Sequence, residues 1–156
     1  MTPAQLADTY HAGAAHLRAA IAGMTREQIV ARPVPGRWST LEVVAHIADF
    51  EPIMADRIKR VISHDNPTLM GADENLFAAH LFYDVRNIEE ELAVVDAIRA
   101  STARMLRQLS VDALNRIGTH NEAGVLTLEK LILRATNHIT HHLTFIREKR
   151  EALGLK

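Results

Sequence analysis

Apolar residues recur at steps of three or four along four stretches of the chain, and this spacing predicts four amphipathic helices. The first stretch begins at Thr2-Pro3, a cap followed by a proline suited to the first helical turn, and extends to Met24. The second begins with Ser39-Thr40-Leu41-Glu42, which has the form of a capping box, and ends at Asp65-Asn66-Pro67. Both stretches therefore carry start signals as well as an apolar face.

The other two stretches lie in the second half of the sequence. One starts at Asn87 and continues to Leu109, and the other follows Thr127 and stops at Gly154, a residue type common at helix C-termini. No segment shows the period-2 alternation of a strand. We therefore expect an all-α four-helix bundle in a single domain over residues 1–156, long enough to bury a core without disulfides.

The connection between the second and third stretches is long, and this constrains how the helices are arranged. Between His64 and Asn87 the chain contains Pro67, Gly71 and a short helix expected over 75–82. That is enough chain to retrace a helix of about 35 Å at about 1.5 Å per residue. Because antiparallel neighbours need only a short loop, the second and third long helices are expected to run parallel.

The composition limits the chemistry that the chain can carry. The 156 residues are 47% apolar, include 18 basic and 19 acidic side chains, and have a formal net charge of -1. This balance gives no electrostatic footprint for nucleic acid, and an aromatic content of 4% offers few stacking platforms. Because cysteine is absent, histidine and carboxylate are the only strong metal ligands.

Targeting signals are also missing from the sequence. No basic segment followed by an apolar stretch opens the chain, and no uncharged apolar run reaches about 18 residues. We therefore expect no secretion and no membrane-spanning helix, and a cytoplasmic location. The expected partner is a small-molecule substrate, with no nucleic acid and no membrane. The sequence does not identify the oligomeric state, and a homodimer is one of the options.

Nine histidines are present, and helical phase separates three that share the last predicted helix. At about 100° per residue, the apolar face includes His142 and borders His138, whereas His141 falls off that face. Residues four apart lie about 6 Å from each other, so the imidazoles of His138 and His142 can bind one ion. Between them, Ile139-Thr140-His141 supplies no glutamate next to the first histidine, which disfavours a zincin protease.

Two ligands alone bind weakly, so a third must come from another helix. His46 is the best candidate, because it lies at the edge of the apolar stripe of the second helix, beside Phe50 and Ile53. Three histidines leave a coordination position open, as in reactive zinc sites. Nickel and zinc both suit imidazole ligands. A histidine pair of this spacing also occurs by chance, so surface or helix-edge roles stay open at this point.

Three further residues are candidates for the surroundings of such a site. Asp49 and Glu51 lie about one turn from His46, and the phase of Glu51 places it among apolar residues, where a carboxylate requires a partner. That partner is Arg57, another basic side chain or a ligand histidine, because ligating histidines usually donate their second N–H to a carboxylate or carbonyl. His120 lies in a predicted loop and is a candidate for lining the cavity.

Two segments resemble the signatures of the DinB-like superfamily. They are Pro35-Gly36-Arg37-Trp38-Ser39 through His46-Ile47-Ala48-Asp49-Phe50-Glu51, and Asn137-His138-Ile139-Thr140-His141-His142. The likeness covers nearly the whole chain, including the order of its elements. It implies a four-helix bundle with up-down-down-up topology and a long crossover between helices two and three. It also implies a divalent metal, nickel or zinc, held by His46, His138 and His142.

The resemblance does not imply a single reaction. Relatives include bacillithiol- or mycothiol-dependent transferases, in which the metal binds the thiol as thiolate. In this chain Leu143-Thr144-Phe145 follows the histidines, where many relatives have arginine, glycine and glutamine, so no thiol is identified. Two hypotheses follow. One is a metal-dependent transferase or hydrolase with an open coordination position, which uses water or a low-molecular-weight thiol. The other is a non-catalytic metal-binding stress-response module, whose site a fourth protein ligand such as His120 would close.

Overall fold

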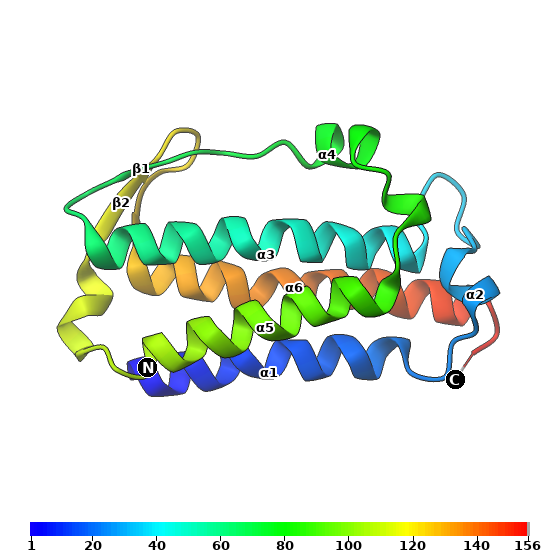
Figure 1. Ribbon diagram of the computed structural model, residues 1–156, viewed down its shortest axis with the longest axis horizontal. Helices are drawn as coiled ribbons and strands as arrows, with labels where there is room; N and C mark the ends of the chain where they lie inside the picture. Colours follow the sequence, from blue (N-terminus) through cyan, green and yellow to red (C-terminus); the bar gives the residue numbers. More distant parts are fainter. Residues whose placement is uncertain (156) are drawn as a thin grey trace.

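The computed structural model describes residues 1–155, and its dominant feature is a bundle of four long helices (Figure 1). These helices are α1 (Pro3–Ile21), α3 (Thr40–Ser63), α5 (Ile88–Leu106) and α6 (Leu128–Ala152). In Figure 1, α1 and α6 run in one direction and α3 and α5 in the other, which gives an up-down-down-up topology. Both α1 and α3 pack against α5 and α6. The expected parallel arrangement of the second and third long helices is confirmed.

The start signals in the sequence explain where the helices begin. Thr2, Ser39 and Thr127 each accept a hydrogen bond from a backbone N–H in the first turn of the helix that follows. At the start of α3 the capping box is complete. The backbone N–H of Ser39 donates to Oε2 of Glu42 at 2.7 Å, and the N–H of Glu42 donates to Oγ of Ser39 at 3.1 Å. This box fixes the start of α3 about two turns before His46.

Short elements complete the connections between the long helices. Helix α2 (Arg26–Val30) lies between α1 and α3, and the 3-10 helix η2 (Val111–Asn115) follows α5. The crossover from α3 to α5 carries α4 (Glu74–His80) and the 3-10 helix η1 (Tyr83–Val85), and it runs beside α3 in Figure 1. The crossover thus brings residues distant in sequence back to the surface of α3.

A small sheet contradicts the expectation that no segment forms a strand. β1 (Thr68–Leu69) pairs in parallel with β2 (Ile117–His120), which pairs antiparallel with β3 (Gly124–Thr127). Strands of two to four residues are too short for a period-2 pattern to be visible in the sequence. Close packing depends on Gly118, because a Cβ there would lie 2.7 Å from Cγ2 of Val61 on α3.

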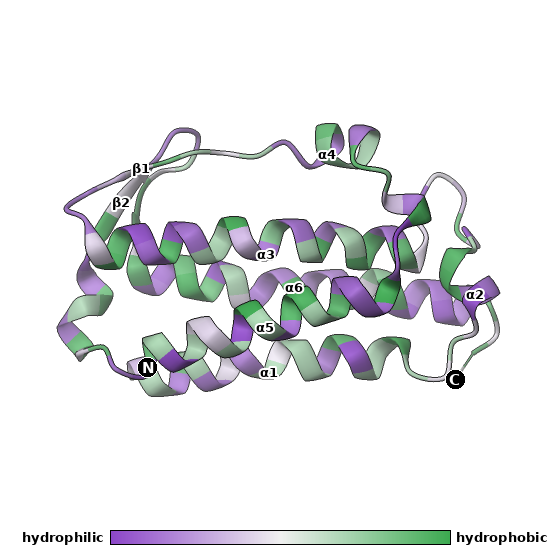
Figure 2. Ribbon diagram, viewed as in Figure 1, coloured by the Kyte–Doolittle hydropathy of each residue, from purple (hydrophilic) through white to green (hydrophobic). Residues whose placement is uncertain are grey.

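The buried apolar side chains form two clusters, one toward each end of the bundle. One cluster includes Leu6, Ile58, Leu106 and Ile132, and the other includes Leu17, Val44, Leu92 and Ile146. Hydrophobic and hydrophilic residues alternate along each long helix, as Figure 2 shows, which is the pattern of helices with one buried face. Within residues 1–155, no helix combines the length and hydropathy needed to span a membrane.

Candidate metal centre

Three histidine side chains meet between α3 and α6. Nε2 of His138 lies 3.0 Å from Nε2 of His46 and 3.2 Å from Nε2 of His142. Each residue offers one ring nitrogen within 4.8 Å of those of the other two. Nitrogen ligands about 2.1 Å from one ion stand roughly 3 Å apart when the angle between them is about 90°. The structure therefore brings the three predicted ligands together in a spacing that fits one divalent ion.

Burial keeps these imidazoles neutral at pH 7. Removal from water lowers the pKa of His46 to about 4 and that of His142 to about 3. The pKa of His138 falls to about 2, because the two neighbouring imidazoles add to the effect of burial. Since neutral imidazole is the form that binds a metal, the ring nitrogens can accept an ion without first losing a proton.

The second ring nitrogens of the same histidines are unsatisfied. Nδ1 of His46, His138 and His142 is buried in each case and has no hydrogen-bond partner among the described residues. Buried polar atoms usually have partners, so a group of three neighbouring exceptions is informative. The rings meet through their Nε2 atoms, so an ion bound there would take up the Nε2 lone pairs and leave each Nδ1 as an N–H group.

A carboxylate from the crossover faces the histidines. Oε2 of Glu74, in the first turn of α4, lies 3.9 Å from Nε2 of His46. The side chain of Glu74 is 59% exposed, whereas that of His46 is fully buried, so the carboxylate lies on the solvent side of the site. The sequence does not predict a role for Glu74, because neither helical phase nor a motif connects a residue on the crossover with α3.

A cavity of about 360 Å³ adjoins the histidines. Trp38 and Phe145 are its aromatic side chains, with ring centroids 5.3 Å from His46 and 5.6 Å from His142, respectively. The volume is suited to a small molecule. The charged or polar lining residues are Arg37, Glu74, His138, His141, His142, Glu148 and Lys149.

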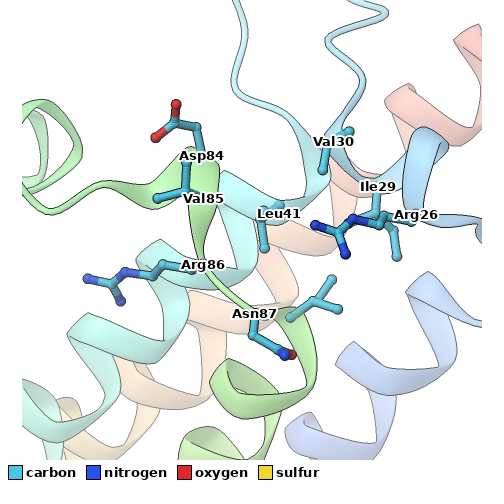
Figure 3. Close-up of a pocket in the computed structure, with 9 residues that line it drawn as sticks. Arg26, Ile29, Val30, Leu41, Asp84, Val85, Arg86 and Asn87 are labelled. Carbon is cyan, nitrogen blue, oxygen red and sulfur yellow. The ribbon is translucent and has the colours of Figure 1, made fainter.

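Another cavity, of about 420 Å³, lies where α2 approaches η1 and the start of α5 (Figure 3). Its lining includes Arg26, Asp84 and Asn87 but no histidine. Arg86 borders this cavity, but its side chain points away from α2 in Figure 3, and its guanidinium binds Asp49. The histidine site therefore has the stronger case as the functional centre, because within residues 1–155 it is the place where metal-binding side chains converge beside a cavity.

Comparison with known proteins agrees with this fold. Residues 9–146 match the DinB superfamily. The chain belongs to the DinB superfamily. The resemblance seen in the two sequence signatures is thereby confirmed, and the match includes the positions of all three histidines.

Relatives of this DinB-superfamily protein have names that refer to metal chemistry. The chain is 28% identical to OB0782 of Oceanobacillus iheyensis over 130 residues, which are 83% of this chain and 75% of the relative. It is 27% identical to GK0616 of Geobacillus kaustophilus over 139 residues, 88% of this chain and 78% of the relative. Both relatives are provisionally named metal-dependent hydrolases.

A solved structure shows the same fold. YfiT from Bacillus subtilis, described provisionally as a metal-dependent hydrolase with an unusual four-helix bundle topology, aligns with a TM-score of 0.90. The alignment covers 99% of this chain and 89% of that chain, at 22% sequence identity. The four-helix bundle expected for this DinB-superfamily protein is thus confirmed.

The two carboxylates predicted near His46 bind arginines. Asp49 accepts two hydrogen bonds from Arg86, at 2.8 and 2.9 Å. Glu51 is fully buried, and its Oε2 lies 3.0 Å from Nη2 of Arg99 on α5. Neither carboxylate forms a hydrogen bond with a ring nitrogen of the three histidines, whose Nδ1 atoms have no partner in the described part of the chain.

The partner of Glu51 is the second residue that sequence reasoning missed. Arg57, which the sequence suggested, donates instead to the backbone carbonyl of Met70. Arg99 lies in phase with the buried Val95 and Leu106, so an arginine on the apolar stripe of its helix was the available signal. A buried arginine requires an anion or carbonyl partner.

His120 and His141 lie outside the ligand cluster. His120 is in strand β2, not in a loop as predicted, and its Nδ1 accepts hydrogen bonds from the backbone N–H groups of Glu122 and Ala123. It stabilises the turn between β2 and β3 and is not among the residues that line the cavity beside the histidines. His141 is exposed, as its helical phase predicted.

Proposed function

We propose that this protein is a metal-dependent hydrolase in which His46, His138 and His142 hold nickel or zinc. The observation that carries the proposal is the convergence of three neutral imidazoles beside a cavity. Among the described residues, no fourth histidine, aspartate or glutamate joins that group. Catalytic zinc sites typically have three protein ligands and an open position, whereas structural sites have four. The provisional names of the relatives support the same class of reaction.

The residues around the cluster fit hydrolysis of a small molecule. A divalent ion at this position would supply a nucleophile by lowering the pKa of water or of a thiol. Glu74 is placed to accept the proton, because its carboxylate lies on the solvent side of His46. In zincin proteases this role belongs to a glutamate next to the first histidine, and α6 has no such residue. Trp38 and Phe145 form the apolar part of the cavity.

The proposal includes a low-molecular-weight thiol as the alternative nucleophile. The chain contains no cysteine, so a sulfur nucleophile has to come from a small molecule. Thiol transfer to an electrophile is therefore a second reaction to assay with the same protein, using bacillithiol, mycothiol and glutathione. The competing proposal is a metal-binding stress-response module without catalysis.

The experiment uses protein purified without a metal-binding tag, loaded with zinc or nickel, and then stripped with chelator. We expect loaded protein to hydrolyse simple esters or to transfer a thiol. We expect the stripped protein to lose this activity and to keep its helical circular dichroism, because four long helices bury a large core without metal. Loaded protein that is inert toward every ester and thiol, or loss of helicity on stripping, would favour the non-catalytic module.

A carboxylate variant tests the role of Glu74. Glu74→Gln removes the proton acceptor but keeps the size of the side chain, so the rate should fall by about 10² to 10⁴. The metal content should stay unchanged, because the three histidines are intact. Glu148→Gln is the matched control, since Glu148 lines the same cavity but is not in contact with His46. Equal effects of the two substitutions would exclude Glu74 as the base.

A further inference from the structure

The same cavity contains two cations that the proposed hydrolysis does not use. We infer that the substrate carries an oxyanion group, a carboxylate or a phosphate, which Lys149 and Arg37 bind beside the metal centre. The inference rests on the proposed function and adds to it the chemical class of the substrate. Its evidence lies in the surroundings of the two side chains and in their distance from the histidines.

Lys149 is a buried cation without an anionic partner. The residue is 2% exposed, and its Nζ donates to the backbone carbonyl of Phe145 at 3.1 Å. An ammonium group has three donors, and within the described residues no carboxylate forms an ion pair with this one. Burial lowers the pKa of Lys149, and Arg37 lowers it further. Since a buried charge is costly without a counterion, the cavity is suited to an anion at this point.

Arg37 places a second cation on the same cavity. It is exposed and directly precedes Trp38, and its guanidinium forms no hydrogen bond or ion pair among the described residues. The nearby carboxylate of Glu42 is already occupied, because Arg32 and the backbone N–H of Ser39 bind it. Arg37 therefore stays available to a ligand that Lys149 also contacts.

Two acidic residues of the cavity define where an anion can bind. Glu74 lies at the histidine end, 3.9 Å from Nε2 of His46. Glu148 is exposed on α6 and raises the pKa of Lys149, but it forms no ion pair with that lysine. An anionic group is therefore expected at the end with Lys149 and Arg37, and the reacting group at the end with Glu74.

Helix geometry limits the distance between the anionic group and the reacting group of the substrate. Lys149 lies two turns beyond His142 on the same face of α6. Its hydrogen bond to the carbonyl of Phe145 brings the ammonium group back by one turn, to about 5 Å along the helix from the Cα of His142, and the metal centre lies further toward the N-terminus because the ring of His142 leans that way. The substrate is therefore a short ester or amide whose anion is a few bonds from the reacting carbonyl. Phe145 lies between the two sites and offers an apolar contact to the linking carbons.

The first test compares esters of similar size and different charge on the metal-loaded protein. The probes are monomethyl glutarate, methyl valerate, and a methyl ester that carries a phosphonate in place of the carboxylate. In each reaction water adds to the carbonyl, the acyl C–O bond breaks, and methanol leaves with a proton. We expect Lys149→Met to raise KM for a charged ester by about 10- to 100-fold, with little change in kcat or in methyl valerate hydrolysis.

Two further variants separate anion binding from a structural role of the lysine. Lys149→Arg keeps the charge and should restore most of the affinity for the charged ester. Lys130→Met removes an exposed lysine near the other end of α6 and should have no effect. Equal KM values for charged and uncharged esters, or an equal effect of Lys149→Met on both, would overturn the inference.

A binding measurement keeps this inference distinct from the proposed function. Glutarate and inorganic phosphate are titrated by calorimetry into the metal-free protein and into its Lys149→Met and His46→Ala variants. We expect one of the two anions to bind the parent and His46→Ala proteins and to fail with Lys149→Met, and the anion that binds identifies the source of the oxyanion. If no ester is hydrolysed but this pattern holds, the proposed function fails and the anion site stands. If neither anion binds, the anion site is wrong even where esters are hydrolysed.

Discussion

Two buried polar clusters share helix α3 and differ in how their polar atoms are satisfied. In the first, the carboxylate of Glu51 contacts Arg99 and the hydroxyl of Tyr10, and the guanidinium of Arg99 donates to the backbone carbonyls of Tyr10 and Ala135 at 2.6 and 2.7 Å. In the second, three histidine rings contact one another and leave their Nδ1 atoms without partners. All four long helices complete the first cluster, whereas the second adjoins a cavity.

The difference separates a structural role from a functional one. A buried ion pair whose guanidinium also donates to backbone carbonyls of α1 and α6 links the four helices, and within residues 1–155 only Nε of Arg99 lacks a hydrogen-bond partner among the guanidinium nitrogens. The Nε2 atoms of the three neutral imidazoles lie 3.0 and 3.2 Å apart, and the lone pairs that meet there can be taken up by one metal ion. A buried charged residue near a candidate site is thus weak evidence for chemistry, and an unsatisfied group beside a cavity is stronger evidence.

The largest effect on stability is expected from breaking the buried ion pair between Glu51 and Arg99. Arg99→Met should lower the free energy of unfolding by about 3 to 5 kcal/mol, because it leaves the Glu51 carboxylate buried without its cation. Urea denaturation of the metal-free protein measures the change. The double variant Glu51→Leu, Arg99→Met should be more stable than Arg99→Met alone. An Arg99→Met protein as stable as the parent would show that the ion pair contributes nothing.

Substitutions in the histidine cluster should weaken metal binding more than they lower the stability of the fold. Alanine at position 46, 138 or 142 should weaken metal binding by more than about 100-fold, which is about 3 kcal/mol, because even residues behind the ligands contribute about 10- to 100-fold. His141→Ala is the control, since His141 is the exposed neighbour of His142. Calorimetry and elemental analysis of untagged protein measure these effects. An equal loss for His141→Ala would contradict the ligand assignment.

The histidine cluster is expected to make the free energy of unfolding depend on pH, by about 2 kcal/mol between pH 7 and pH 6. The folded-state pKa values of the three histidines, about 4, 2 and 3, lie below the ordinary value near 6.5. As the pH falls from 7 to 6, the unfolded chain therefore takes up protons that the folded chain does not bind. Each histidine then costs roughly 0.7 kcal/mol of stability, and the three together about 2 kcal/mol.

Denaturation at several pH values in the presence of chelator measures this slope. His142→Ala should remove about a third of the part of the slope that the three clustered histidines contribute, and His141→Ala should leave that part unchanged. Stability that does not vary between pH 7 and 6 would mean that the histidines are as free to take up protons in the folded state as in the unfolded chain.

How much the sequence predicts depends on whether the interaction is local. The capping box at Ser39 and Glu42 and the phase of His138 and His142 are properties of a single helix, and they were read directly. His46 was found because it borders the apolar stripe of its own helix. The apolar spacing predicts ends for the first and third long helices that lie about one turn beyond the observed ends at Ile21 and Leu106. The reason is that apolar residues continue past the point where the chain turns.

The residues that were missed are held by contacts between distant segments. Glu74 reaches His46 only because the crossover returns along α3, and Arg99 reaches Glu51 only because α3 and α5 run parallel. The short strands exist because β1 and β2 pair across a long separation in sequence. Local periodicity carries no information on any of these three contacts.

The smallest expected effect concerns Gly13 on α1, where a substitution that usually stabilises a helix should destabilise this one. Glycine within a helix costs about 1 kcal/mol relative to alanine. Here a Cβ at position 13 would lie 2.3 Å from Nη1 of Arg99, an atom that cannot easily move because it donates to the carbonyl of Tyr10. Gly13→Ala should therefore lower stability by about 1 kcal/mol, since the cost of overpacking exceeds the helical gain.

The Arg99→Met background provides the control for Gly13→Ala. Without the guanidinium the added methyl group meets no rigid atom, so Gly13→Ala should become neutral or stabilising by up to about 1 kcal/mol. The reversal of sign across the double-mutant cycle would locate the strain at the contact between Gly13 and Arg99. The same destabilisation in both backgrounds would show that the contact with Arg99 is not its source, and Cδ1 of Ile139, at 3.6 Å from the added Cβ, is at an ordinary contact distance.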